Sequence, residues 1–360
     1  MYSLNELQMM VGLQHLTSLR RLVIDRCPKL LSLLDNDVEV GLRGGVGEGV
    51  LVLPSCIEYM ELSYCDSLKK RPQSLCNLHC LKDAMIEGAV GLTCLPKGLD
   101  KLTSLQTMTI SKCPNLVSLA ERKLPIGLQS FSIEDCHNLE SLPEELDKLT
   151  SLQIMRISKC PNLVSLAEMK LPIELQSLSI KECLALESFP DMGLPTTLVN
   201  LFIEKCGKLN SLPQGLHKLR NLEALYIMEC SFLMDCKHLE PLCSLGLQNL
   251  TSLKSVTIVG CPDLVSILKG LLPTNLEYFY ITDCPILESL HDGLSDLNSL
   301  NHLSIINCPI LAQRYQQKKG DEWSKIAQIP DVQIDGRRQY FNEVNDVGEE
   351  NDIDEENDKM

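Results

Sequence analysis

Aromatic residues are scarce in this sequence, and the short motifs of common enzymes are absent. Phe, Trp and Tyr make up 4% of the 360 residues, and Trp occurs once, so Leu and Ile must fill any core. There is no G-x-x-x-x-G-K-[ST] phosphate loop, no H-E-x-x-H helix and no C-x-x-C pair of the kind that binds zinc. The seven His residues are scattered, and none has a partner at metal-ligand spacing. We therefore expect a chain that is not an enzyme, with no catalytic, metal-binding or cofactor-binding residue.

Positive charge and long apolar runs are also lacking. Lys and Arg number 33 against 48 Asp and Glu, and the net charge of −15 argues against binding to nucleic acid or anionic membranes. No apolar run approaches the roughly 18 residues that a membrane helix requires. The segment Met1–Gln8 has neither the basic nor the apolar region of a signal peptide. The composition predicts a soluble, cytoplasmic protein without a membrane span.

What the sequence does contain is a repeat. The stretch from Leu102 to Leu116, Leu-Thr-Ser-Leu-Gln-Thr-Met-Thr-Ile-Ser-Lys-Cys-Pro-Asn-Leu, returns 47 residues later with two changes. A variant of the same pattern lies between the copies, so the unit is 23 or 24 residues long. A unit of about 20–29 residues written L-x-x-L-x-L/I-x-x-C/N-x-x-L is the leucine-rich repeat signature. It predicts an α/β solenoid, a horseshoe with parallel strands on the concave face and short helical, 3₁₀ or irregular segments on the convex face.

We count about twelve repeats, which sets the domain organisation. Their first leucine-type positions are Leu19, Ile57, Leu81, Leu105, Leu128, Leu152, Leu175, Leu198, Leu222, Leu253, Leu276 and Leu300. The solenoid is predicted to cover 1–311, with insertions near 35–53 and 234–246. Terminal repeats need a cap with a polar outer face, and we assign 312–341 to it. Residues 342–360 are too acidic and too poor in apolar residues to fold, and are predicted to form a disordered tail.

Within each repeat, alternating apolar and polar residues predict one short strand. In the fourth repeat it runs roughly from Thr107 to Ser111, with Met108 and Ile110 pointing inward. The clearest convex helical turn is Pro143–Leu149, because Pro suits the first helical position and acidic residues follow it. The third repeat has Ala84 where the others have a large apolar residue, so we expect the stack to be thinner there.

Cysteine is abundant, and its placement is regular. Of 17 Cys residues, eleven share one position, three residues after the second inward apolar residue of a repeat. These slot cysteines are Cys27, Cys65, Cys113, Cys136, Cys160, Cys183, Cys206, Cys230, Cys261, Cys284 and Cys308. Many leucine-rich repeats carry Asn there, which satisfies backbone groups at the bend after the strand. A buried Cys is a small hydrophobe with a weak S–H donor, so we predict reduced, buried, unreactive thiols.

The concave strand face is where a solenoid usually binds its partners. The position between the two inward residues is small and polar in the middle repeats and aromatic in the C-terminal third, and a second column carries charge. The candidate protein-binding residues are Arg156, Lys181, Phe202, Glu204, Tyr226, Tyr278 and Tyr280. Aromatic residues are enriched at interface hot spots. The alternative is that these rings are ordinary surface residues, or that the 234–246 insertion or the cap covers them.

Three features resemble the leucine-rich repeat region of plant intracellular nucleotide-binding leucine-rich-repeat immune receptors of the coiled-coil class. They are Cys-Pro-x-Leu after several strands, the alternation of Leu-Thr-Ser-Leu with Leu-Pro-x-x-Leu, and an ending, Lys319–Pro330, similar to G-x-x-W-x-K-I-x-x-I-P. The resemblance covers about 1–337; Gln328 replaces a usual His, and Tyr315 stands where Cys is common. It implies a protein-recognition and autoinhibitory region that acts in defence against pathogens. ADP or ATP would bind only a nucleotide-binding domain, which this sequence lacks.

The partner is therefore expected to be a protein: a pathogen effector, a guarded host protein or the receptor's own nucleotide-binding domain. A second hypothesis, from a different class, is a free-standing leucine-rich repeat scaffold or substrate adaptor of a ubiquitin ligase. The genomic sequence upstream of Met1 distinguishes them, since a phosphate-loop domain favours the receptor and an F-box favours the adaptor.

Overall fold

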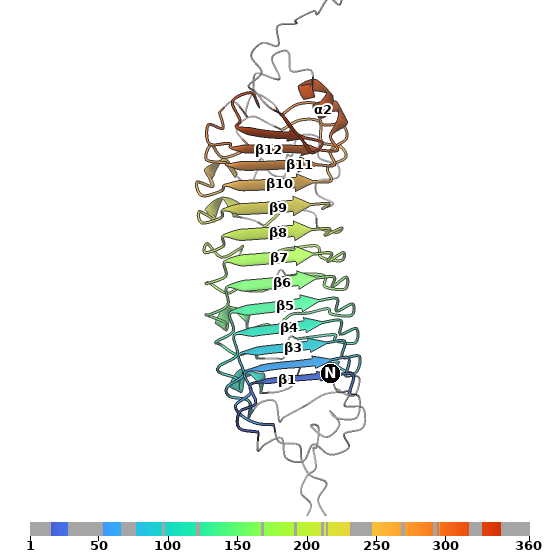
Figure 1. Cartoon of the computed structure of the whole chain (residues 1–360), viewed down its shortest axis with the longest axis vertical. Coiled ribbons are helices and arrows are strands. Elements are labelled where there is room, and N and C mark those ends of the chain that lie inside the picture. Colours follow the sequence, from blue (N-terminus) through green and yellow to red (C-terminus); the bar gives the residue numbers. More distant parts are fainter. Residues whose placement is uncertain are drawn as a thin grey trace, which may run out of the picture.

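The computed structural model is a leucine-rich repeat solenoid built on one long sheet (Figure 1). It describes residues 16–27, 53–65, 77–95, 98–119, 123–166, 169–190, 193–209, 212–213, 215–230, 247–267, 271–290, 294, 296–316 and 326–339. The 35–53 insertion, apart from Leu53, lies outside these residues, as do the 234–246 insertion and the 342–360 tail. The 14 strands follow one another in sequence order; β1 to β13 are parallel, and β14 is antiparallel to β13.

The strands recur once per repeat, as the sequence predicts. They are β1 (Arg21–Asp25), β2 (Tyr59–Ser63), β3 (Asp83–Glu87), β4 (Thr107–Ser111), β5 (Ser130–Glu134), β6 (Ile154–Ser158), β7 (Ser177–Lys181), β8 (Asn200–Glu204), β9 (Ala224–Met228), β10 (Ser255–Val259), β11 (Tyr278–Thr282), β12 (His302–Ile306), β13 (Asp331–Ile334) and β14 (Arg337–Gln339). The predicted strand of the fourth repeat is confirmed as β4, and its Met108 and Ile110 are buried. Because every repeat runs in the same direction, equivalent positions pair across the sheet and form columns.

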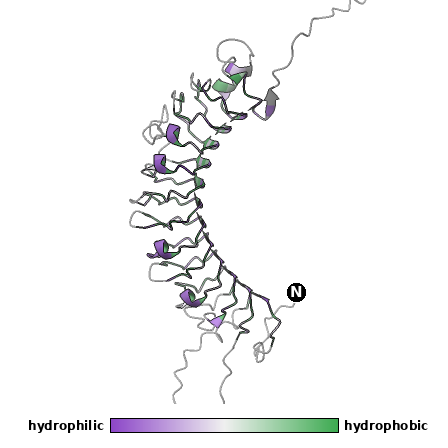
Figure 2. Cartoon of the chain, turned by 90° about the vertical axis from the view of Figure 1, so that its left-hand side faces the viewer, coloured by the Kyte–Doolittle hydropathy of each residue, from purple (hydrophilic) through white to green (hydrophobic). Residues whose placement is uncertain are grey.

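The solenoid is curved, with the strands on its inner side (Figure 2). Among the described residues, the convex side carries the 3₁₀ turns η4 (Leu99–Lys101), η5 (Leu146–Lys148), η6 (Leu216–Lys218) and η8 (Leu247–Asn249). The predicted helical turn at Pro143–Leu149 is confirmed in part, because η5 occupies only its last residues. Hydrogen bonds hold neighbouring strands about 4.8 Å apart. The 3₁₀ turns and irregular segments on the convex side are wider than this spacing, so the stack curves toward its strands.

A left-handed residue and a cysteine follow eleven of these strands, β1, β2 and β4 to β12. The residue before the slot cysteine has a positive φ, as at Lys112 and Lys159, with φ of 51° and 52°. Its backbone N–H still donates to the next repeat; the Lys112 amide reaches the Glu134 carbonyl at 2.9 Å. The chain therefore turns away from the strand without leaving a buried amide unpaired.

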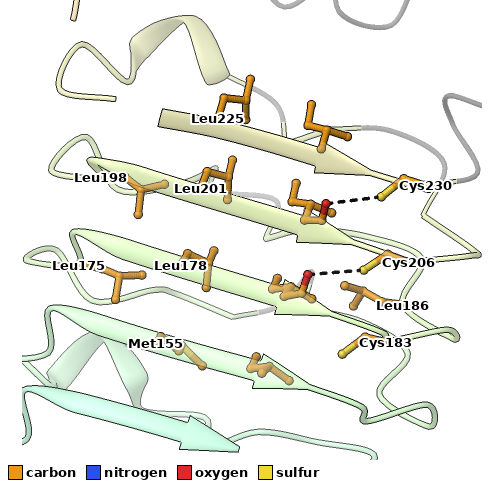
Figure 3. Packing of buried hydrophobic residues seen from close by; sticks show 14 of the residues in the cluster. Met155, Leu175, Leu178, Cys183, Leu186, Leu198, Leu201, Cys206, Leu225 and Cys230 are labelled. Carbon is orange, nitrogen blue, oxygen red and sulfur yellow. Dashed lines mark hydrogen bonds between the residues drawn. The ribbon is translucent and has the colours of Figure 1, made fainter. Parts of the chain in front are cut away.

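The prediction that the slot cysteines are buried and form no disulfide bonds is confirmed. Ten of their thiols donate to the backbone carbonyl two residues earlier, at 3.2–3.5 Å. Cys206 and Cys230 also reach the Ile180 and Ile203 carbonyls of the preceding repeat at 4.0 Å (Figure 3). The thiol thus serves the bend as the sequence predicts, as a weak donor and a small apolar filler.

Native alkylation should separate the slot cysteines from the exposed Cys80. Burial raises the pKa of Cys160 to about 11 and that of Cys183 to about 12. At pH 8 a thiol of pKa 11 is thiolate at about one part in a thousand, and only the thiolate attacks iodoacetamide. Mass spectrometry after brief native labelling should find Cys80 modified and Cys160 and Cys183 free. Denaturation should make all three react, and ready native labelling of Cys160 would contradict the buried position.

The third repeat is thin, as expected. Ala84 on β3 is only partly buried, and a small void of about 20 Å³ lies beside it among Leu62, Leu81 and Met108. The left-handed position there is Gly88, with φ of 62°. A Cβ at Gly88 would lie 2.5 Å from Cδ1 of Tyr64. Glycine is therefore needed at this strand end for a tertiary reason, since other repeats tolerate Lys or Asp in the same backbone conformation.

Gly88→Ala is expected to lower the free energy of unfolding by about 1–2 kcal/mol, because it adds left-handed strain and displaces the Tyr64 ring. Gly336→Ala is the matched control: its φ is 75°, and a Cβ there meets nothing within 4 Å. Urea denaturation of both variants isolates the ring clash, and equal losses would show that Tyr64 moves aside without cost.

The C-terminal end differs from a simple cap. Helix α2 (Pro309–Gln316) follows β12, and the described part of the expected cap, 312–341, then supplies β13 and β14. β13 pairs in parallel with β12, so the sheet continues beyond the twelve repeats of the sequence count. The spacing Ile329-x-x-Val332-x-Ile334 matches the repeat template and could have predicted β13 from the sequence. All three side chains are buried.

Candidate functional site

The middle residue of each strand forms a column along the concave face. In-register pairing joins Ser179 to Phe202, Phe202 to Tyr226, Tyr226 to Thr257 and Thr257 to Tyr280. The apolar residues on either side of these positions are buried, which turns the middle side chain outward. The geometry therefore gathers residues some 23 to 31 positions apart in sequence onto one surface. We call the surface formed by Phe202, Tyr226, Tyr278 and Tyr280 the aromatic surface.

Phe202 and Tyr226 form a parallel stack. Their ring centroids are 4.4 Å apart and their planes differ by 8°. Both side chains are partly exposed. Stacked aromatic pairs contribute roughly 0.5–1.5 kcal/mol beyond the area they bury, so the two rings hold each other in place. A rigid, half-exposed apolar patch loses little side-chain entropy when a partner covers it.

Tyr278 and Tyr280 lie on β11 beside His302 of β12. The His302 ring is 5.1 Å from the Tyr280 ring and 6.4 Å from the Tyr278 ring, tilted at 45° and 43°. His302 Nδ1 lies 2.9 Å from Oδ2 of Asp331 on β13. Partial burial raises the pKa of the Tyr280 phenol, and the neighbouring Tyr226, Tyr278 and Asp331 raise it further. His302 and Asp331 thus lie along one side of the aromatic surface. Sequence analysis missed both, because it did not follow the first strand position beyond Tyr278 and did not predict β13.

A hollow opens where the aromatic column is interrupted. It is an open depression of about 510 Å³ lined by Tyr226, Ser255, Thr257, Tyr278, Tyr280 and Thr282. Thr257 stands in register between Tyr226 and Tyr280. The lining thus combines tyrosine rings with the hydroxyl groups of Ser and Thr. It can therefore receive a flat group that also makes hydrogen bonds.

The charged candidates lie beside the aromatic surface. Lys181 Nζ is 3.1 Å from Glu204 Oε2, and Lys205 approaches the same carboxylate at 3.9 Å. Arg156 is exposed on β6, two strands from Phe202 on β8. Partly exposed ion pairs contribute little to stability. The structure thus brings Lys181 and Glu204 together and leaves Arg156 apart from the rings; whether any of them binds a partner stays a prediction.

A second cluster, also missed in the sequence, lies at the N-terminal end of the same face. The Arg21 guanidinium sits 4.0 Å from the centroid of the Tyr59 ring. Tyr59 OH donates to Glu61 Oε2 at 2.8 Å, and Arg21 approaches that oxygen at 3.9 Å. Tyr64 at the end of β2 shares the Glu87 carboxylate with Lys112. Arg21 and Tyr59 occupy the first strand position, and Tyr64 and Lys112 occupy the left-handed position after the strand.

No protein-family model and no curated protein matches the sequence. Solved structures similar to it include an internalin from Listeria monocytogenes, at 15% identity over 90% of this chain and 83% of that chain, with a TM-score of 0.43. The leucine-rich repeat domain of the type III effector XopL is 20% identical over 84% of this chain and 87% of that chain, with a TM-score of 0.33. A Leptospira interrogans leucine-rich repeat protein is 17% identical over 86% of this chain and 98% of that chain, with a TM-score of 0.29. The fold assignment rests on the strand order and register of this chain itself.

Two absences hold for the described part of the chain. No helix there is both long and apolar enough to cross a membrane. Within the same residues, no three His, Cys, Asp or Glu side chains gather as metal ligands. The chemistry that the described surface offers is aromatic stacking, hydroxyl hydrogen bonding and scattered charge.

Proposed function

We propose that this chain is the protein-recognition and autoinhibitory leucine-rich repeat region of a plant cytoplasmic immune receptor. The observation that carries the recognition role is the aromatic surface, where the stacked Phe202 and Tyr226 lie beside the hollow at Thr257. A leucine-rich repeat solenoid is a scaffold for protein interaction, and its concave face is the extended surface that partners use. Tyrosine and phenylalanine are among the residues enriched there.

The receptor class is supported by sequence features that the fold uses. The Cys-Pro-x-Leu motif supplies the buried thiol and the turn after the strand, as at Cys113 and Cys160. The described part of the Lys319–Pro330 ending contributes Ile326 and Ile329, which are 0% and 1% exposed and lead into β13. These two residues of the ending thus belong to the packed C-terminal end of the solenoid.

Genomic sequence upstream of Met1 tests the class directly. A nucleotide-binding domain with a phosphate loop is expected within the same reading frame. An F-box in that place would overturn the receptor proposal and support the ubiquitin-ligase adaptor.

A defence-output assay tests the role of the surface. In the receptor, the triple variant Phe202→Ala, Tyr226→Ala, Tyr280→Ala is expected either to lose the response to its trigger or to signal without one. The first result assigns the surface to recognition of an effector or guarded protein, and the second assigns it to restraint of the nucleotide-binding domain. Thr109→Ala, at the same register position on β4, is the control. A triple variant that folds and behaves like the control would remove the proposed surface.

A further inference from the structure

The break in the aromatic column has room for one flat group. Phe202 and Tyr226 show that rings on adjacent strands stack on this face, at 4.4 Å. Tyr226 and Tyr280 are two strands apart, which corresponds to roughly 9–10 Å. A planar group above Thr257 would therefore lie one stacking distance from each of them. The hollow of about 510 Å³ occupies this position.

At the N-terminal end of the same face, a guanidinium already stacks on one tyrosine ring. There the chain places its own guanidinium, from Arg21, over the ring of Tyr59, next to the carboxylate of Glu61. A guanidinium stacks on aromatic faces, being planar and weakly hydrated, while its N–H groups bond to neighbouring acceptors. Tyrosine, carboxylate and arginine on adjacent strands thus form a compatible set on this scaffold.

The C-terminal strands leave this surface open to a cation. The strands β8 to β12 contain no Lys or Arg, and their one charged residue, Glu204, lies 3.1 Å from Lys181 of β7. Ser255, Thr257 and Thr282 in the lining of the hollow offer hydroxyl oxygens as acceptors. A lysine ammonium is a compact, strongly hydrated point charge, so it binds an aromatic face less often than a planar guanidinium, which can stack on two rings and donate to the hydroxyls.

We infer that the hollow at Thr257 is an arginine-binding site, in which a partner protein inserts one arginine side chain between Tyr226 and Tyr280. This inference rests on the proposed recognition function and names the chemistry that the partner presents. The guanidinium faces stack on the two rings, and its N–H groups donate to Ser255, Thr257 or Thr282.

The first test uses N-acetyl-arginine amide as the probe, with N-acetyl-lysine amide and N-acetyl-phenylalanine amide for comparison. Tyrosine ring resonances of the labelled full chain are followed during titration. Tyr226 and Tyr280 are expected to shift saturably, with a dissociation constant on the order of 1–10 mM. The lysine and phenylalanine probes should bind at least about fivefold more weakly. Tyr59 and Tyr64 are internal controls and should not move. Equal responses to all probes, or from all tyrosines, would overturn the inference.

Filling the hollow gives the second test. Thr257→Tyr completes the aromatic column and should weaken binding of the arginine probe at least about tenfold, whereas Thr109→Tyr on β4, flanked in register by Met85 and Ser132, should leave it unchanged. Tyr280→Leu removes one wall and should weaken binding about fivefold, which keeps the test decisive if Thr257→Tyr folds poorly. Arginine binding retained in both would overturn the site. A third outcome separates the two proposals. If a protein partner requires the aromatic rings but the chain does not bind the arginine probe, the recognition function stands and only the arginine site is removed.

Discussion

Phe131→Ala is expected to lower the free energy of unfolding by about 3–5 kcal/mol, the usual cost of truncating a fully buried ring. Phe131 on β5 is 0% exposed and lies at the centre of the stack, where Met108 and Met155 pair with it from β4 and β6. In a solenoid each repeat is stabilised by its neighbours alone, so the loss weakens the two adjoining interfaces. The unfolding transition should therefore broaden as well as shift, as the parts on either side begin to unfold separately.

Phe202→Ala is the matched control for this variant, since it removes the same atoms from a partly exposed position on β8. Its expected cost is at most about 1 kcal/mol, from the lost stack on Tyr226. Urea denaturation followed by circular dichroism measures both, and hydrogen exchange shows whether strands next to β5 lose protection first. Similar losses for the two variants would mean that the concave rings are packed as deeply as the core, and hence not available to a partner.

Tyr226→Ala is expected to weaken binding of the protein partner by about thirtyfold, because truncating an aromatic at the centre of an interface typically costs about 2 kcal/mol or more. Tyr226 is central by position, with Phe202 stacked on one side and the hollow on the other. Its melting temperature should fall only slightly, as the side chain is partly exposed.

A double-mutant cycle with Phe202→Ala tests whether the two rings act as one unit. Rings in direct contact are expected to show non-additive losses, with a coupling of about 0.5–1.5 kcal/mol. Calorimetric or surface-based binding assays on both single variants and the double variant give this value. Unchanged binding by correctly folded variants would remove the aromatic surface. Additive losses would show that the partner contacts each ring independently.

The inner strands could be predicted from the sequence more readily than the strand at the C-terminal end. Strands β4 and β6 lie in two nearly identical sequence segments 47 residues apart, and the same alternation of apolar residues buries the same faces in both. β13 was not predicted, although Ile329, Val332 and Ile334 fit the template, because the polar stretch after α2 obscures the spacing. A strand at the end of a stack is formed by the edge that it pairs with, and β12 offers such an edge.

The repeat, the inward apolar residues, the burial of the slot cysteines and the column with Phe202, Tyr226 and Tyr280 could all be predicted from the amino-acid pattern. They follow from a period of two within each strand and of 23 or 24 between most strands. The exposure of each outward residue depends instead on tertiary packing. Ser179 is 9% exposed and Ser304 is 5% exposed, although both face the concave side. The reason is that a short side chain lies in register between longer ones from neighbouring repeats, and these neighbours cover it. The same register, acting on residues a full repeat apart, stacks Phe202 on Tyr226 and opens the hollow at Thr257.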